Sequence, residues 1–448
     1  MQSKLQAGYA RTNITPPLGI DISGYFKERI ADGVLDELEA CAVALRCGDK
    51  TAVIITLDLC YLPTALCNEI RLAAAEAAGV APEALYIHCT HTHQGPAIGK
   101  KHKNPIVNEY FTFLLHRVCD TAFMAIADLK DARMGIGVGE ARNVAFIRRY
   151  RMKDGSAKTN PGVNNPDIVA PIGETDERVS VVRFDREGAD SIVLASFANH
   201  PDVVGGNKIS ADWPGMTRRI SERAIDGTKF IFLNGAQGDV NHVNVHPKAG
   251  DFNDMFNDFD GCSRGYGHAR HIARVVSGAI MSVYDKVEWM EVDSLDYTHK
   301  VVEIASNKAD PKDLPLAHKY HDLHMAGRDD LIPFEAMMLT TVVAEAGRMV
   351  RLENAPDAFP MTFSAIRLGE VAFFGIPGEP FTGVGRGIKG AEGYKLVIPS
   401  CNTNGAEGYF PMKDSYDEGG YEARSSSYKA GSAERIIDEG LKILADLR

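Results

Sequence analysis

The sequence predicts a mixed α/β fold in which β-sheets are flanked by helices. Apolar runs of strand length alternate with longer segments of helical spacing along most of the chain. A hydrophobic content of 45% and a charged content of 24% are typical of a globular protein with a sizeable core. No internal repeat and no long linker rich in Pro, Ser or Gly divides the 448 residues, so we expect a single domain over residues 1–448.

The first elements follow the order strand, helix, strand. Residues 38–57 predict a β-hairpin, because two apolar runs flank turn residues at 48–50. Residues 68–78 are rich in Ala and Glu at helical spacing, and Gly79 ends the pattern. Residues 84–89 form a short apolar run that predicts a buried strand. This order is typical of α/β proteins.

The remainder of the chain continues the alternation. We expect helices at residues 109–129, 214–224, 267–284, 334–352 and 433–447. We expect strands at residues 178–184, 191–197, 229–233, 361–368, 370–374 and 394–399. Residues 159–176 are rich in Pro, Asn and Gly without periodicity, which indicates an ordered functional loop.

The charge and the cysteines exclude several classes of protein. A net charge of −11 argues against a nucleic-acid or anionic membrane surface. The longest basic cluster, residues 148–153, is short and predicts a polar, substrate-facing loop. No signal peptide or membrane-spanning run is recognisable, so we expect no membrane insertion. Eight cysteines without a CxxC motif indicate buried thiols in a reducing, cytoplasmic setting.

The strongest local motif is a pair of alternating histidines after an apolar run. Residues 86–96 end in Thr90-His91-Thr92-His93 and then break at Gly95-Pro96. In an extended segment, His91 and His93 share one face just past the strand's end, where α/β folds place ligands. The alternative is a polar strand end whose histidines only form structural hydrogen bonds. A single histidine would not distinguish this alternative from a ligand site. Two histidines on one face favour a ligand site.

Two later apolar runs also deliver polar side chains. Residues 192–199 lead to His200, which is followed by a proline, and residues 371–378 lead to Glu379, also followed by a proline. A single strand-terminal histidine is more often structural than functional, so His200 gains weight only beside the other candidates.

A third run leads into a glycine-punctuated loop at residues 234–241. Gly235 and Gly238 would allow close approach of backbone amides to a ligand or anion, and Asp239 and Asn241 add polar groups. The alternative is a tight turn with an Asx cap. Residues 402–422 follow another strand and are dense in Tyr, Gly and acidic residues, which suits either a functional loop or simple packing.

Together these residues resemble the neutral ceramidase family, amidohydrolases that cleave N-acyl-sphingosine and include bacterial relatives of unassigned substrate. The likeness begins at residues 8–17 and includes the Thr90–His93 motif and the loop at residues 234–241. It ends with Gly378-Glu379 and the run Tyr409, Tyr416, Tyr421 and Glu422. It covers nearly the whole chain and implies a neutral-ceramidase-like catalytic domain.

The resemblance implies one zinc ion per chain. In the family, zinc is bound by the first histidine of the THTH motif, a later strand-terminal histidine, the glutamate of a Gly-Glu pair and a tyrosine upstream of a Tyr-Glu pair. The matching residues here are His91, His200, Glu379 and Tyr409. The same resemblance places His93, and an arginine from the pair Arg148 and Arg149, close to bound water or substrate.

Two departures from the family pattern concern the substrate. Asn241 stands where ceramidases carry a serine in the motif Gly-Asp-x-Ser, so that serine's role cannot operate here. The chain ends at Arg448 without the family's immunoglobulin-like domain, and no secretion signal is recognisable. We therefore expect a small polar substrate rather than ceramide in a membrane.

The sequence thus predicts a zinc-dependent hydrolase of an amide or ester, in which metal-activated water attacks the carbonyl. His93 is the first choice for acid–base catalysis, and Arg148, Arg149, Asp239 and Asn241 complete the predicted site. The arginines and residues 160–166 are expected to bind the polar part of the substrate. Asp58 either orients a ligand histidine or caps a turn.

Two rival functions follow from the same residues. A non-catalytic protein that binds a polar ligand and keeps a structural metal is favoured by Asn241. A serine-nucleophile hydrolase is the weaker rival, since no Gly-x-Ser-x-Gly motif is present. The sequence does not name the substrate or exclude another divalent ion, and it leaves open whether the protein forms a homo-oligomer.

Overall fold

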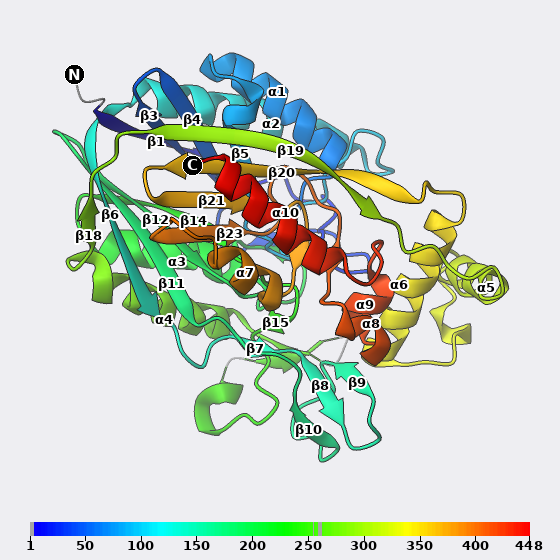
Figure 1. Cartoon of the computed structure of the whole chain (residues 1–448). Helices are drawn as coiled ribbons and strands as arrows, with labels where there is room; N and C mark the ends of the chain where they lie inside the picture. The colour runs from blue at the N-terminus through cyan, green and yellow to red at the C-terminus, as the bar shows by residue number, and fades with distance from the viewer. Residues whose placement is uncertain (1–3, 254, 259–261) are drawn as a thin grey trace.

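Two mixed β-sheets with helices on their outer faces form the protein, as expected from the sequence (Figure 1). The computed structural model describes residues 4–253, 255–258 and 262–448. Within these residues the larger sheet has nine strands, in the order β14-β12-β11-β6-β1-β3-β4-β5, with β18 paired to β6. The smaller sheet has four strands, in the order β19-β20-β21-β23.

The larger sheet is mostly antiparallel. Its strands are β1 (Leu5–Asn13), β3 (Glu39–Cys47), β4 (Lys50–Leu57), β5 (Leu85–Cys89), β6 (Lys130–Glu140), β11 (Arg178–Arg186), β12 (Ser191–Phe197), β14 (Thr228–Asn234) and β18 (Glu288–Met290). The predicted hairpin is confirmed as β3 and β4, whose pairing is antiparallel. Only the pairs β4–β5 and β12–β14 are parallel within this described sheet. The two parallel pairs lie at opposite ends of the strand order, and the sheet curls so that β14 contacts β4 and β5.

Four helices cover the larger sheet. They are α1 (Thr64–Ala78), α2 (Pro105–Ala127), α3 (Asp212–Ala224) and α4 (Tyr266–Tyr284). The predicted stop at Gly79 is confirmed, because Gly79 adopts a left-handed φ of 65° at the end of α1. The start of α2 is set by Asn104, whose side chain accepts a hydrogen bond from the Ile106 amide. In Figure 1, α2 packs on β1 and β3, α1 packs on α2 and β5, and α3 and α4 lie beside β14, β11 and β6.

The smaller sheet consists of β19 (Leu295–Ala305), β20 (Ala358–Leu368), β21 (Val371–Gly375) and β23 (Leu396–Ser400). The helices α7 (Thr382–Lys389) and α10 (Ser432–Asp446) pack on it (Figure 1). One hydrophobic cluster includes Leu45 and Ile55 of the larger sheet and Ile366 and Phe373 of the smaller one. The two sheets therefore share a core.

Peripheral elements surround the ends of both sheets. The helical ones are η1 (Pro82–Ala84), η2 (Ala249–Phe252), α5 (Leu314–Met325), η3 (Asp329–Leu331), α6 (Ala336–Leu352), α8 (Asp414–Glu418) and α9 (Tyr421–Ser425). A three-stranded sheet is formed by β8 (Arg149–Met152), β9 (Ala157–Thr159) and β10 (Ile168–Pro171). Short pairs join β2 (Gly33–Val34) to β13 (Lys208–Ile209), β7 (Phe146–Ile147) to β15 (Val240–Asn241), β16 (Phe256–Asn257) to β17 (Ser263–Arg264), and β22 (Glu379–Pro380) to β24 (Tyr409–Phe410).

Two predicted loops contain regular structure. The basic segment at residues 148–153 was expected to be a polar loop, but most of it is the strand β8, in which Arg149 is buried. The segment at residues 159–176 contains β10, which pairs with β8. The loop expectation for residues 148–153 was wrong because charge reports only local preference, whereas pairing with β9 and β10 orders this segment. Residues 159–176 are irregular apart from Thr159 and β10, as expected of an ordered loop.

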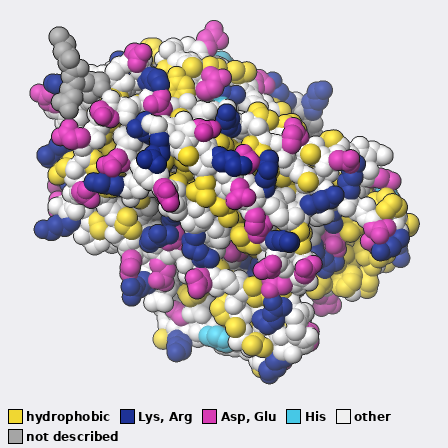
Figure 2. Space-filling model, in the orientation of Figure 1, with side chains coloured by type: hydrophobic (Ala, Val, Ile, Leu, Met, Phe, Trp, Pro, Cys, Tyr) yellow, Lys and Arg dark blue, Asp and Glu magenta, His cyan; other side chains and the backbone are white. Residues whose placement is uncertain are grey.

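The visible surface in Figure 2 mixes Lys and Arg with Asp and Glu, without a continuous basic area on this face. Across the described ranges, none of the helices combines the length and the apolar character needed to cross a bilayer. Seven of the eight cysteines are buried, and Cys119 is partly exposed, which agrees with the expected burial of the thiols.

Candidate metal centre

The ends of three strands from the two sheets meet at one place. The Asn234 backbone amide, at the end of β14, donates to His88 Nε2 on β5 at 2.9 Å. The Cys401 amide, just after β23, donates to the Asn234 carbonyl at 3.1 Å. The Asn234 side chain donates to the Thr90 carbonyl at 3.1 Å. These hydrogen bonds hold the segments that carry the candidate residues against one another.

His88 belongs to the framework of the site. Its Nδ1 lies 2.7 Å from the Cys401 carbonyl, and its Nε2 accepts the Asn234 amide. Burial lowers the pKa of His88 to about 3, so the imidazole is neutral with its proton on Nδ1. The alternative of a hydrogen-bonded polar strand end therefore applies to this histidine.

His91 adopts a left-handed backbone conformation, with φ of 75°. The expected extended segment from His91 to His93 is therefore wrong, since φ is negative in a strand. The two side chains still meet, with their Nε2 atoms 3.2 Å apart. A left-handed non-glycine residue is costly and is found mainly where surrounding contacts hold it, often at functional sites. Here the Cys60 carbonyl lies 2.8 Å from His91 Nδ1.

His200 and Glu379 complete a buried cluster around His91. His91 Nε2 lies 3.1 Å from His200 Nε2 and 3.1 Å from a Glu379 carboxylate oxygen. The same carboxylate oxygen lies 3.6 Å from His200 Nε2. Two imidazole nitrogens and one carboxylate thus converge on a common centre. His91 and Glu379, the first and last of these residues, are 288 positions apart in the sequence.

Tyr409 is aligned with Glu379 by strand pairing. The short strands β22 and β24 are parallel, with Glu379 opposite Tyr409. The adjacent Gly378 has a φ of 154°, and a Cβ there would lie 2.5 Å from the Gly408 carbonyl oxygen. Glycine is therefore needed to bring these two strands together. Burial raises the pKa of the Tyr409 phenol well above its ordinary value, with the Glu379 carboxylate acting in the same direction.

The charges of the cluster are interdependent. Burial alone would lower the pKa of His91, but the Glu379 carboxylate raises it above its ordinary value. Burial would raise the pKa of Glu379, yet His91 and His200 hold it well below its ordinary value. Burial lowers the pKa of His93 well below its ordinary value, and the neighbouring His91 and His200 lower it further. His93 is therefore neutral at pH 7.

Arg148 and Arg149 face opposite sides of the chain. Arg148 Nε lies 2.6 Å from the buried Glu422 carboxylate, and its guanidinium lies 5.4 Å from the centre of the Tyr409 ring. Arg149 instead donates to the Ser415 hydroxyl at 2.8 Å and pairs with Glu418 at 3.1 Å. Of the two predicted arginines, Arg148 lies beside the cluster, whereas Arg149 joins β8 to α8.

The loop at residues 234–241 is engaged within the protein. The Gly235 and Gly238 amides donate to the Phe197 and Pro380 carbonyls at 3.1 and 2.8 Å. The expectation that these amides face a ligand is therefore wrong. Asp239 accepts hydrogen bonds from the Thr382 amide and hydroxyl at 2.7 and 2.9 Å, and burial raises its pKa to about 6.

The side chains of Asn241 and Asp58 form hydrogen bonds with residues other than the clustered histidines. Asn241 Nδ2 donates to the Asn160 side chain at 3.0 Å, which ties the loop to the predicted substrate-binding segment. Asp58 accepts hydrogen bonds from Arg218 and from the Glu39 amide, at 2.8 and 3.0 Å. The Asp58 side chain therefore caps the backbone amide at the start of β3 and does not contact a ligand histidine directly.

A small cavity of about 60 Å³ opens beside the cluster. Its polar lining includes His93, Arg148, Asn160, His200, Asp202, Arg264, Tyr409 and Tyr421. Its other walls are Gly24, Tyr25, Phe26, Met337 and Thr340. No local sequence pattern marks Asp202, Arg264, Tyr25 or the α6 residues of this lining, because each stands at an isolated position.

The loop at residues 24–26 presses on His93. A Cβ at Gly24 would lie 2.7 Å from the His93 ring, and the Tyr25 ring centre is 5.0 Å from that of His93. Gly24 also has a φ of 105°, which disfavours other residues. This early glycine, which no motif marks, allows the loop to cover the candidate acid–base residue.

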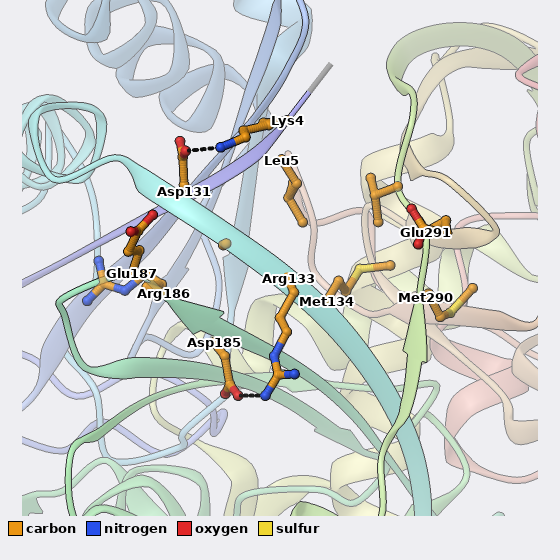
Figure 3. Close-up of a pocket in the computed structure, with 12 residues that line it drawn as sticks. Lys4, Leu5, Asp131, Arg133, Met134, Asp185, Arg186, Glu187, Met290 and Glu291 are labelled. Carbon is orange, nitrogen blue, oxygen red and sulfur yellow. Dashed lines mark hydrogen bonds and ion pairs between the residues drawn. The ribbon is translucent and has the colours of Figure 1, made fainter. Parts of the chain in front are cut away.

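A more open surface hollow lies elsewhere, between the start of β1, the strand β6 and the segment after β18 (Figure 3). It carries the ion pairs Lys4–Asp131 and Arg133–Asp185, at 3.2 and 2.9 Å. None of its lining residues belongs to the histidine cluster. Although this hollow is larger than the cavity beside the histidines, it is the weaker candidate for a functional site, because it lacks converging buried polar groups.

Comparisons with known proteins agree with the fold. No protein-family model and no curated protein matches the sequence. The crystal structure of neutral ceramidase from Pseudomonas aeruginosa matches with a TM-score of 0.71, over 100% of this chain and 75% of that chain, at 18% identity. The structure of a ceramidase complexed with C2 matches with a TM-score of 0.71, over 99% and 76%, at 16% identity. The chain thus has a neutral-ceramidase-like fold, as the resemblance of its motifs predicted.

Proposed function

We propose that this chain is a metal-dependent hydrolase that cleaves an amide or ester bond in a small polar substrate with the help of one zinc ion. The observation that carries the proposal is the buried convergence of His91, His200 and Glu379 beside a cavity. The fold of ceramidases supports the class of reaction. The shared core of the two sheets also leads us to infer that the 448 residues act as one catalytic domain.

The residues of the cluster fit a divalent cation. His91 Nδ1 lies 2.8 Å from the Cys60 carbonyl, and His200 Nδ1 lies 3.3 Å from the Gln237 carbonyl. Metal-binding histidines usually donate their other ring N–H to such a partner, which directs the remaining lone pair at the metal. Both Nε2 atoms here lie near the Glu379 carboxylate. Tyr409, opposite Glu379, is the fourth ligand in this proposal.

When bound, the cation supplies a Lewis acid that polarises the substrate carbonyl and lowers the pKa of water. His93, which is neutral and buried at the cavity, accepts the proton of the attacking water and returns it to the leaving group. Arg148 donates hydrogen bonds toward the oxygen on which negative charge develops, because Glu422 and the Gly238 carbonyl hold its guanidinium in place.

The cavity favours a small polar substrate. Arg148, Asp202 and Arg264 line it together with Phe26 and Met337. A long acyl chain would need an extended apolar channel, whereas charged and amide side chains form much of this wall. The Asn160 side chain, which Asn241 holds, is placed to bind a hydroxyl, amide or carboxylate of the substrate.

Metal analysis followed by a substrate screen tests the proposal. Purified protein should contain one divalent cation per chain and hydrolyse a member of a panel of small amides, esters and lactones. A chelator should abolish turnover, and added zinc should restore it. Turnover that survives complete removal of metal would refute the proposed metal dependence.

The alternative is a protein that binds a polar ligand without turnover. Asn241 favours it, because this residue replaces the family serine and is occupied by hydrogen bonds to Asn160 and the Val243 amide. Tightly bound metal with ligand binding but no hydrolysis, across the whole panel, would support this alternative instead.

Replacement of His93 by Asn should lower kcat by about 10²- to 10⁴-fold, the usual contribution of a positioned acid–base group. Metal content should remain that of the wild-type chain, because His91, His200 and Glu379 stay in place. Steady-state kinetics with metal analysis of the same sample measures both. A variant that loses its metal, or keeps full turnover, would contradict the assigned role.

The two neighbouring arginines provide a matched pair of variants. Arg148→Lys should lower kcat by about 10²- to 10³-fold, the loss typical of removing one donor from the site of developing charge. Arg149→Lys should leave the kinetic constants almost unchanged, because Arg149 pairs with Glu418 away from the cavity. Equal effects of the two substitutions on kcat would show that the assignment of Arg148 is wrong.

A further inference from the structure

The cavity beside the histidine cluster is small for a ligand site. Its volume is about 60 Å³. Pockets that enclose small molecules usually measure roughly 300–1,000 Å³. A single water needs about 10–15 Å³, so the cavity has room for about four waters. The walls of this cavity therefore limit the size of any group that lies beside His93.

Tyr25 is the aromatic wall of the cavity that lies against His93. The two ring centres are 5.0 Å apart, and both side chains line the cavity. The preceding Gly24 has no Cβ and a φ of 105°, which lets the loop approach the His93 ring closely. Arg29, at the end of the same loop, donates hydrogen bonds to the carbonyls of Ser23 and His93, both at 2.6 Å. These bonds tie the loop that carries Tyr25 to the backbone of His93.

Two guanidinium groups hold the ring of Tyr25. The central guanidinium carbons of Arg29 and Arg264 lie 4.2 and 4.8 Å from the centre of this ring. Both arginines are buried, and the attraction between a cation and an aromatic ring is stronger where water is excluded. By contrast, Phe26 is 48% exposed, and Met337 has an unbranched side chain that adapts its shape. Tyr25 is therefore the fixed bulky wall, whereas Phe26 and Met337 can yield to a ligand.

We propose that Tyr25 determines specificity by limiting the size of the leaving group, the amine or alcohol that hydrolysis releases. This inference rests on the proposed function, in which His93 returns a proton to the leaving group. The atom that receives this proton must lie within hydrogen-bond reach of His93, and therefore close to the Tyr25 ring. The substrate class is thus a primary amide, an N-methyl amide or a methyl ester. The limit does not apply to the acyl group, which is bonded to the other side of the carbonyl carbon.

Two series of esters separate the leaving group from the acyl group. Acetate esters of methanol, butanol and benzyl alcohol vary the leaving group, whereas methyl esters of acetic, pentanoic and phenylacetic acid vary the acyl group. In the wild-type chain, kcat/KM should fall by at least about 10-fold from methyl to butyl acetate, because a misfit of one methylene group alone changes kcat/KM by about 10- to 200-fold. The corresponding amides of methylamine and butylamine should follow the same order.

Three variants of Tyr25 test the role of its ring. Tyr25→Ala should lower the ratio of kcat/KM for methyl acetate to that for butyl acetate by about 10-fold, and it should leave the ratios within the acyl series unchanged. Tyr25→Leu keeps an apolar side chain that is smaller than the ring, so it should give an intermediate ratio even if Tyr25→Ala fails to fold. Tyr25→Phe is the matched control, because it keeps the ring and should keep the wild-type ratio.

Binding of phosphonates reports the size limit without any need for turnover. Methyl methylphosphonate and butyl methylphosphonate carry a tetrahedral phosphorus that resembles the intermediate of ester hydrolysis, and their alkoxy groups stand in for the leaving group. In calorimetry with the zinc-loaded, full-length protein, the butyl compound should bind at least about 10-fold more weakly than the methyl compound. Tyr25→Ala should bring the two affinities close together, and Tyr25→Phe should keep them apart.

Equal methyl-to-butyl ratios in the wild-type chain and in Tyr25→Ala would overturn the proposal. A change confined to the acyl series would overturn it too, as would the failure of both phosphonates to bind. The proposed hydrolase would fail separately, by absence of turnover with every ester and amide. Size-selective phosphonate binding that depends on Tyr25, without any turnover, would thus uphold the size limit at this wall while refuting the hydrolase.

Discussion

Glu379→Gln should bind a divalent cation about 100-fold more weakly than the wild-type chain, since even disturbed outer-shell partners cost 10- to 100-fold in metal affinity. Glu379 supplies the only negative charge of its cluster, and its carboxylate oxygen lies 3.1 Å from His91 and 3.6 Å from His200. The neutral amide keeps the shape but removes the charge that attracts the cation. Hydrolysis should fall with metal occupancy.

Competition with a chromophoric chelator measures this affinity, and metal analysis after dialysis confirms occupancy. Glu407→Gln is the matched control, because Glu407 is also partly buried but binds Tyr428 and Thr64 instead of the cluster. If Glu379→Gln and Glu407→Gln retained equal metal affinity, the assignment of Glu379 as a ligand would be lost.

Arg218→Met should lower the free energy of unfolding by about 3–5 kcal/mol, the usual cost of removing one partner of a buried ion pair. Arg218 and Asp58 have side-chain exposures of 1% and 0%, and their closest nitrogen and oxygen atoms lie 2.5 Å apart. Without the guanidinium, the Asp58 carboxylate stays buried without its cation. Asp58 also accepts from Thr90, beside His91, so metal affinity should weaken as well.

Urea unfolding followed by circular dichroism gives the change in stability. Lys100→Met serves as the control, since the pair Lys100–Glu69 is about half exposed and such pairs contribute less than about 1 kcal/mol. A loss from Arg218→Met as small as that from Lys100→Met would contradict the structural importance of this buried pair.

The helices and strands that the sequence predicted correctly are those with strong local patterns. The hairpin β3–β4 and the helix stop at Gly79 follow from turn residues and periodicity that need no tertiary partner. The strands β6 and β19 and the helix α5 were not predicted. Their residues are mixed in polarity, and their exposure follows no regular alternation along most of each strand, so pairing with neighbouring strands defines β6 and β19.

The candidate site also has features that local sequence patterns predict and features that only tertiary contacts determine. A histidine that follows a buried strand is visible as a local pattern, which is how His91, His93 and His200 were selected. The backbone conformation of His91 could not be predicted in this way, because its left-handed φ depends on contacts such as the one with the Cys60 carbonyl. Nor could the sequence separate Arg148 from Arg149, since either neighbour could have faced the cavity.

Composition, periodicity and strand-terminal residues were sufficient for the α/β class and for most residues of the cluster, because these depend on short stretches of chain. Which groups lie within a coordination distance depended on how distant strand ends pack. The pairing of β22 with β24, the burial of Arg149 against α8 and the approach of Cys60 to His91 all join residues that share no local pattern. Long-range packing and hydrogen bonding determine such contacts, and no short segment of the sequence contains that information.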